Sequence, residues 1–240
     1  MLDPLQRPDI NRLNHYSTHR GNLALSSCPG KKVRLSGPVK GRASISRDLD
    51  LDLDRMKSLD IAMIVCCLDD TELDFLGATW DKYKQIATKH GIEIVRLPMQ
   101  EGAAPESLEQ VKNVIDRVDV VIESGKNVLA HCRGGVGRAG LFACCWLLEH
   151  DLCFTAMRAV HIVRTQRSPK AIETHKQAEY IINYSIGVSQ RHNKLITKWE
   201  NVKKYSLQYT RPLTHSICPT LDTVSRMEQD MMMQIASSHY

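Results

Sequence analysis

The sequence has 240 residues, of which 42% are hydrophobic and 25% are charged, and its formal net charge is +5. These proportions are typical of a globular protein and exclude a chain that is disordered throughout or embedded in a membrane. The net charge falls short of the clustered basic stripe of a nucleic-acid-binding protein, so neither a nucleic acid nor a membrane is expected as a partner. The first 20 residues lack the apolar core of a secretory signal, and we expect a cytoplasmic or nuclear location.

Three regions are expected along the chain. Residues 1–22 are polar, contain two prolines and show no periodicity, which is typical of an N-terminal arm. Residues 23–190 should form one α/β domain, and residues 191–240 should add a C-terminal helix and a tail. The eight cysteines include no CxxC pair with the spacing of metal ligands, so we expect reduced thiols, no metal and no other cofactor.

Hydrophobic patterns predict the elements of this domain in chain order. Apolar runs rich in β-branched residues predict buried strands at residues 61–68, 92–99 and 127–131. Helical periodicity predicts one helix that ends before Gly91 and a second that ends before Gly125, with Pro105 in its first turn. Further helices are expected at residues 138–150, 155–167, 171–189 and 194–209. Strands that alternate with helices predict a mostly parallel sheet.

The segment HCRGGVGR, His131 to Arg138, joins the last predicted strand to the helix at residues 138–150. Its three glycines let the backbone adopt positive φ angles and turn N–H groups inward, which makes a concave site for an anion. The helix that follows adds the positive end of its dipole. Arg138 adds a planar guanidinium that can hold two phosphate oxygens. The residues expected to bind phosphate are Arg133, Gly134, Gly135, Val136, Gly137 and Arg138.

Cys132 lies at the junction of strand and helix, where the helix end and Arg138 favour a thiolate over a thiol. We therefore expect Cys132 to be a nucleophile. A cysteine after an apolar strand is by itself more often a small core residue, and the glycine-rich loop decides against that interpretation. The loop lacks the GK[ST] of a nucleotide-binding P-loop.

Two neighbours of Cys132 each keep two interpretations. His131 is either a core histidine bonded to the backbone or a supporting residue whose hydrogen bonds tune the thiolate. Arg133 is either a solvated residue at the rim of the site or a residue that reads the substrate.

The sequence resembles the protein-tyrosine-phosphatase superfamily, whose signature is HC, five residues and Arg, and within it the dual-specificity group of kinase-associated type. The supporting segments are SSCPGKK, CCLDDTEL, HGIEIVRLP and RSPKAIETHKQAEYI, and the resemblance spans about residues 23–185. It implies a central sheet of four or five mostly parallel strands with helices on both faces, so that residues 23–190 would be a phosphatase-like catalytic domain. It also implies a thiol-phosphate intermediate and no metal requirement.

Two positions depart from the family pattern. The resemblance places Glu101, in the loop MQEGAAPE, where the family has an aspartate that protonates the leaving group. Glu101 is either this general acid or a solvated loop carboxylate, and the alternative acids are Asp69, Asp70 and Glu106. Ala139 stands where many members have a Ser or Thr hydroxyl that assists breakdown of the intermediate, so slow turnover is expected.

The sequence therefore predicts an enzyme that hydrolyses phosphate monoesters, with Cys132, Arg138 and Glu101 as catalytic residues and His131 as a supporting residue. The resemblance implies phosphotyrosine or phosphothreonine in a protein as substrate, with a kinase as one candidate partner, and a monomer is expected. Two alternatives stay open. One is a weakly active or inactive module that binds phosphorylated partners, and the other is a phosphatase of non-protein phosphate esters.

Overall fold

The structure of the chain, a computed structural model, describes residues 3–5, 21–150 and 152–209. The chain divides after His192 into two compact units. The long helix α7 (His175–Tyr209) begins in the first unit and ends in the second. All the other helices and strands described belong to the first unit. None of the described helices combines the length and the apolar character needed to cross a membrane.

A five-stranded sheet forms the centre of the first unit, in the order β1-β2-β7-β5-β6. Its strands are β1 (Asp3–Leu5), β2 (Leu23–Ser27), β5 (Ile61–Cys66), β6 (Glu93–Arg96) and β7 (Asn127–Cys132). The strands β2, β7, β5 and β6 run parallel, and β1 is antiparallel at the edge. The α/β class and the mostly parallel sheet of four or five strands are confirmed.

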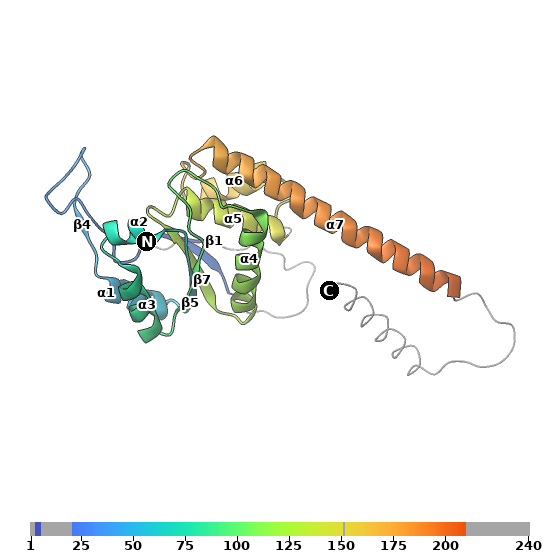
Figure 1. Ribbon diagram of the computed structural model, residues 1–240, viewed down its shortest axis with the longest axis horizontal. Coiled ribbons are helices and arrows are strands. Elements are labelled where there is room, and N and C mark those ends of the chain that lie inside the picture. The colour runs from blue at the N-terminus through green and yellow to red at the C-terminus, as the bar shows by residue number, and fades with distance from the viewer. Residues whose placement is uncertain (1–2, 6–20, 151, 210–240) are drawn as a thin grey trace. The chain divides into compact units, whose positions relative to one another are not determined.

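Helices cover both faces of this sheet (Figure 1). On one face, α1 (Leu49–Ser58) and α3 (Trp80–Lys89) pack on each other and on β5 and β6. On the other face, α4 (Leu108–Glu123) and α5 (Arg138–Glu149) pack against β7, and α6 (Ala156–Gln166) packs on α5. Because α5 lies between the sheet and other helices, nearly all its residues are buried, which explains its apolar sequence.

The parallel strands end at the same edge of the sheet. In the register, Ser27 at the end of β2 pairs with Cys132 at the end of β7, and Cys66 at the end of β5 pairs with His131. The helix α2 (Asp70–Phe75) follows β5 at this edge. Loops at the carboxyl ends of parallel strands are the usual place for a functional site, so the loops after β2, β5, β6 and β7 meet around Cys132.

The predicted strands are confirmed as β5, β6 and β7, and helices α3 to α6 lie where they are expected. The sequence analysis misses β2, α1, α2 and a separate two-stranded sheet of β3 (Lys32–Val33) and β4 (Ile45–Ser46). The segment LDLDLD in α1 alternates as a strand would, but the buried side chains Leu49, Leu53 and Met56 follow a helical period.

Two predicted boundaries are wrong. Pro105 lies before α4, which begins at Leu108 because Ser107 Oγ caps the helix by accepting the Gln110 N–H at 3.1 Å.

The helix predicted at residues 171–189 begins only at His175, because Ile172 has a φ of 61° and cannot be helical. It continues through residues 194–209 as one helix, since that stretch contains no Gly or Pro. The tail expected at residues 213–240 lies outside the described residues, and Asp3–Leu5 is the described part of the expected arm before residue 21.

Candidate active site

The loop from His131 to Arg138 turns back on Cys132. The Gly135 N–H donates to Cys132 Sγ at 3.2 Å, and Cys132 is only 3% exposed. Helix α5 begins at Arg138, and its N-cap residue Gly137 has no side chain that could bond to the first N–H groups. The first turn of α5 therefore presents N–H groups and a positive dipole end at the loop, as an anion site requires.

Carbonyl groups of this loop point outward and bind basic side chains. Lys31 Nζ donates to the Arg133 carbonyl at 3.0 Å. Arg167 donates through Nη2 to the Gly134 carbonyl at 3.3 Å and through Nε to the Gly135 carbonyl at 2.9 Å. In a trans peptide the following N–H points opposite to the carbonyl, so three consecutive N–H groups face the other side of the loop. These inward N–H groups form an anion nest.

Gly135 fixes this loop against β2. Its φ is 69°, and a Cβ built on it would lie 2.2 Å from the Ser26 carbonyl oxygen. Only glycine fits so close an approach of two backbones. A Cβ on Gly134 would meet nothing within 4 Å, whereas a Cβ on Gly137 would meet the Glu173 carboxylate at 2.2 Å.

Arg138 is almost completely buried and is held by two partners. Its Nη2 donates to Glu72 Oε1 at 2.9 Å, and its Nη1 donates to Glu72 Oε2 and to the Met99 carbonyl, the latter at 2.7 Å. Burial disfavours the cation, but the bond to Glu72 and the nearby Cys132 raise the pKa of Arg138. These bonds leave the Nε–H and one Nη2–H, along one edge of the guanidinium, for two phosphate oxygens.

His131 is fully buried, and its Nε2 lies 3.0 Å from Tyr83 Oη on α3. Burial, with a smaller contribution from the charges of Arg96 and Arg138, lowers the pKa of His131 to about 3. The imidazole is therefore neutral at physiological pH and adds no positive charge beside the thiol. This favours a core histidine that bonds through Nε2 to Tyr83, while its buried Nδ1 has no hydrogen-bond partner among the described residues.

Three further thiols lie near Cys132 but are completely buried. Burial raises the pKa of Cys66 to about 11 and raises the pKa values of Cys28 and Cys67 well above the ordinary value. The Cys28 and Cys66 thiols donate to backbone carbonyls. Of these four cysteines, Cys132 is the one whose sulfur accepts a backbone N–H. The loop therefore directs a backbone hydrogen-bond donor at one of these four thiols.

Glu101 lies at a pocket of about 330 Å³ that adjoins the loop. Its side chain is 68% exposed, and Arg133 Nη1 donates to Glu101 Oε2 at 3.3 Å. The Arg133 guanidinium also lies 5.5 Å from the centroid of the exposed Phe75 ring. Glu72 lines the same pocket, so the pocket reaches the partner of Arg138. The structure thus places Glu101 and the Arg133 side chain at the rim of the site.

The loop that carries Glu101 is fixed by α7 and by the residues just before it. Thr174 Oγ1 donates to the Gly102 carbonyl at 2.7 Å, and Gln177 Nε2 donates to the Ala103 carbonyl at 3.4 Å. The Met99 carbonyl on the other side of Glu101 accepts from Arg138. Because both flanks are held, the reach of the Glu101 carboxylate depends on its own side-chain torsions.

The alternative acids have other contacts. Asp69 caps α2 by accepting the Glu72 N–H at 2.8 Å, and Asp70 pairs with Arg96 at 2.7 Å. Glu106 is exposed in the segment before α4. Among the residues that the structure describes, no group of three or more His, Cys, Asp or Glu side chains could hold a metal ion.

Sequence reasoning misses five residues of the site: Lys31, Glu72, Tyr83, Arg167 and Glu173. Four of them lie in the segments SSCPGKK, CCLDDTEL and RSPKAIETHKQAEYI, so the resemblance marks their neighbourhood without assigning a contact. Tyr83 has no such signal, because its position on the apolar face of α3 predicts a core residue.

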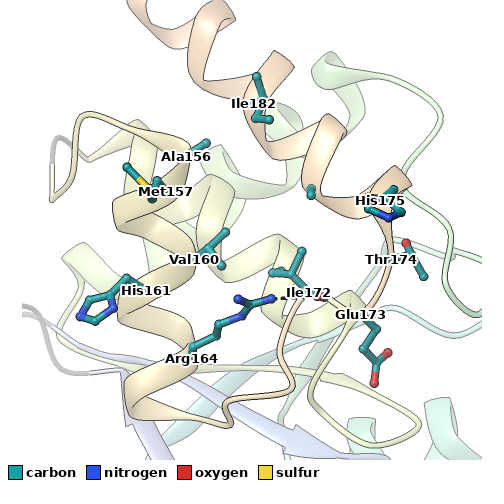
Figure 2. Close-up of a pocket in the computed structure, with 11 residues that line it drawn as sticks. Ala156, Met157, Val160, His161, Arg164, Ile172, Glu173, Thr174, His175 and Ile182 are labelled. Atoms are coloured by element: carbon teal, nitrogen blue, oxygen red, sulfur yellow. Dashed lines mark hydrogen bonds between the residues drawn. The ribbon is translucent and has the colours of Figure 1, made fainter.

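A larger cavity of about 840 Å³ lies between α6 and α7 (Figure 2). Apolar side chains form most of its wall, and Figure 2 shows Val160 and Arg164 of α6 facing Ile172. Arg164 Nε donates to the Ala171 carbonyl at 3.0 Å. The residues that line this cavity include no cysteine and do not belong to the glycine-rich loop at Cys132.

A parallel strand that delivers a thiol to the floor of an anion nest, with an arginine on the following helix, is the arrangement of cysteine-dependent phosphatases. The chain is similar to proteins of that superfamily, which includes the protein-tyrosine and dual-specificity phosphatases. The family profile described as "polymorphic toxin system, DSP-PTPase phosphatase" matches residues 53–151.

Similar proteins cover most of the domain. Cyclin-dependent kinase inhibitor 3 of Sus scrofa is 27% identical over 174 residues, which cover 72% of this chain and 74% of that protein. A crystal structure of kinase associated phosphatase, with serine in place of its catalytic cysteine, matches with a TM-score of 0.61 and 23% identity over 70% of this chain and 88% of that chain. The structure of Tk-PTP in its active form matches with a TM-score of 0.52 and 27% identity over 69% and 92% of the two chains.

We expect Gly135→Ala to disrupt the loop and Gly134→Ala to be tolerated. A methyl group at position 135 would overlap the Ser26 carbonyl at a φ of 69°, whereas one at position 134 meets open space. A strained left-handed residue costs about 1–3 kcal/mol, which lowers the Tm of a domain of this size by roughly 3–10 °C. Thermal unfolding followed by circular dichroism, with phosphate affinity as a second readout, should separate the variants. Equal Tm and equal affinity would contradict the packing of the loop.

Proposed function

We propose that this protein is an enzyme that hydrolyses phosphate monoesters on phosphorylated proteins, with Cys132 as nucleophile. The observation that carries the proposal is the Gly135 N–H directed at Cys132 Sγ at 3.2 Å, within a loop whose outward carbonyls leave its N–H groups facing inward. A phosphate bound to these N–H groups would lie against the sulfur. The thiolate is then placed to attack phosphorus.

In the first step, the phosphate occupies the nest with two oxygens on the free edge of the Arg138 guanidinium. The Cys132 thiolate attacks phosphorus, and a sulfur–phosphorus bond forms as the bond to the leaving oxygen breaks. Arg138 and the loop N–H groups stabilise the charge on the equatorial oxygens. Glu101 donates its proton to the leaving oxygen, for which its side chain turns from Arg133 toward the nest.

In the second step, water attacks the phosphorus of phosphocysteine and gives a proton to the Glu101 carboxylate. The sulfur–phosphorus bond breaks, inorganic phosphate leaves and the Cys132 thiolate is restored. Ala139, the second residue of α5, is fully buried and carries no hydroxyl that could donate to the departing sulfur. We propose that this step is slow for that reason.

A protein substrate is supported by the similarity to a cyclin-dependent kinase inhibitor and to a kinase associated phosphatase. The Phe75 ring, 68% exposed at the mouth of the pocket, offers an aromatic face on which a phosphotyrosine ring can stack. Phosphothreonine in proteins is the second proposed substrate. Seven cysteines are described and all are free thiols, which supports a cytoplasmic or nuclear location.

A second candidate function is a weakly active module that binds phosphorylated partners. The exposed ion pair of Glu101 with Arg133 and the missing hydroxyl at Ala139 favour it, because both affect the proton transfers and not the nest. The variants Cys132→Ser and Glu101→Gln, described next, distinguish phosphate binding from hydrolysis.

Cys132→Ser should lower turnover by at least ~10⁴-fold, because a serine hydroxyl is hardly ionised at neutral pH. Phosphopeptide affinity should persist, since the loop N–H groups and Arg138 remain in place. Phosphate release measures the first effect and fluorescence anisotropy of a labelled phosphopeptide measures the second. Cys153→Ser, a substitution outside the loop, is the matched control. Turnover near that of the wild type in Cys132→Ser would eliminate the mechanism.

Glu101→Gln should slow hydrolysis of an alkyl phosphate by roughly 10²–10⁴-fold, because a poor leaving group needs the proton. An activated aryl phosphate, whose leaving oxygen is stable as an anion, should lose much less. The ratio of kcat/KM for the two substrates is the measurement. Small and equal losses on both would refute the assignment and direct attention to Asp69, Asp70 and Glu173, through their Asn and Gln variants.

A further inference from the structure

A basic hairpin extends from the edge of the sheet where the candidate active site lies. We define it as residues 31–47, which contain six Lys or Arg residues and no Asp or Glu. The strands β3 and β4 pair antiparallel at its base, and Figure 1 shows the connection between them projecting away from the sheet. The overall net charge of +5 conceals this local concentration of positive charge.

The base of the hairpin is fixed beside the mouth of the site. Lys31 Nζ donates to the Arg133 carbonyl in the nucleophile loop at 3.0 Å. The Lys32 N–H donates to the Leu76 carbonyl at 2.8 Å, and Leu76 lines the pocket that also contains Glu101. A ligand that fills the pocket and continues outward therefore has the hairpin as a neighbouring surface.

Most positive charges of the hairpin have no acidic partner. Arg47 pairs with Asp52 at 2.7 Å. The hairpin has four other cations beyond Lys31, namely Lys32, Arg34, Lys40 and Arg42. None of these four forms an ion pair with a residue that the structure describes.

The acidic helix α1, which follows directly, does not neutralise them. Its residue Asp50 pairs with Lys89 and His90, and Asp52 is taken by Arg47. The concentration of positive charge extends to Lys31, whose pKa is lowered by burial and by the neighbouring cations, Arg133 first among them. A field of one sign at the mouth of a cleft attracts ligands of the opposite sign.

We propose that the basic hairpin binds an acidic segment of the phosphorylated protein substrate, next to the phosphorylated residue held in the nest. This inference rests on the proposed function and adds a substrate class to it, namely phosphoresidues flanked by Asp and Glu. A membrane surface fits less well. The hairpin contains no aromatic residue, and its exposed large apolar side chains are Leu35 and Val39 alone. Membrane-surface segments instead combine basic residues with a broad apolar face that includes aromatic side chains.

The test compares two phosphotyrosine peptides that differ only in their flanking residues, Asp and Glu in one and Asn and Gln in the other. The wild type should show a kcat/KM about 10-fold higher for the acidic peptide at low salt. This preference should shrink as salt screens the charges. The Cys132→Ser protein should show the same preference in peptide affinity, which needs no turnover.

The variant Lys40→Asn/Arg42→Gln should lose most of the preference while its hydrolysis of a small aryl phosphate stays unchanged. Asn is chosen because residue 40 has a φ of 49°, a conformation that Asn tolerates. The matched control is Arg55→Gln/Lys57→Gln, which removes the same charge from exposed positions at the end of α1. That helix end leads into the first residues of β5, at the opposite edge of the sheet from Cys132, so the control should keep the preference.

Three outcomes overturn the inference. The first is equal kcat/KM and equal affinity for the two peptides, and the second is an equal loss of the preference for the acidic peptide in the hairpin variant and the control. The third is hairpin-dependent sedimentation with phosphatidylserine vesicles without a preference for the acidic peptide. Failure of the proposed function looks different. In that case the wild type hydrolyses neither peptide nor the aryl phosphate, while the affinity of the Cys132→Ser protein for the two peptides still tests the hairpin.

Discussion

The backbone of Gly135 approaches the Ser26 carbonyl so closely that a single methyl group would collide with it, and the arrangement of the site depends on this contact. It holds the loop against β2 while β7 delivers Cys132 from the neighbouring position in the sheet. With the loop fixed there, its carbonyls bind Lys31 and Arg167 on the outside, and its N–H groups face the thiol. The nest is thus a consequence of packing between strands, and the helix α5 adds its dipole to a site that the backbone has already shaped.

Charge in the site is distributed between ion pairs and neutral groups. The Glu72 carboxylate compensates the buried charge of Arg138, and removal of one partner from such a buried pair leaves an uncompensated charge. His131 is neutral because it is buried with Tyr83. Positive charge beside Cys132 therefore comes from the arginine and the helix end, and Glu72 leaves one edge of the guanidinium free for the proposed phosphate.

The sequence predicts the parts of the site that depend on neighbours in the chain. The strand to Cys132, the glycine-rich turn and the helix from Arg138 form one continuous pattern, and the structure contains all three. Contacts between distant segments cannot be predicted in this way, since the partner of Arg138 is Glu72, on a six-residue helix that the hydrophobic pattern does not mark. The basic hairpin is hidden for a related reason, because overall composition averages its charges with those of the acidic helix after it.

The central claim is that phosphate passes through the sulfur of Cys132, and trapping that species tests it most directly. The missing hydroxyl at Ala139 should let the intermediate accumulate. The wild-type protein, mixed with an excess of phosphopeptide and quenched within milliseconds to seconds, should carry one phosphoryl group, and tandem mass spectrometry of the digest should locate it on Cys132. A quenched protein that turns over substrate but carries no phosphoryl group, or carries it on another residue, would contradict the account.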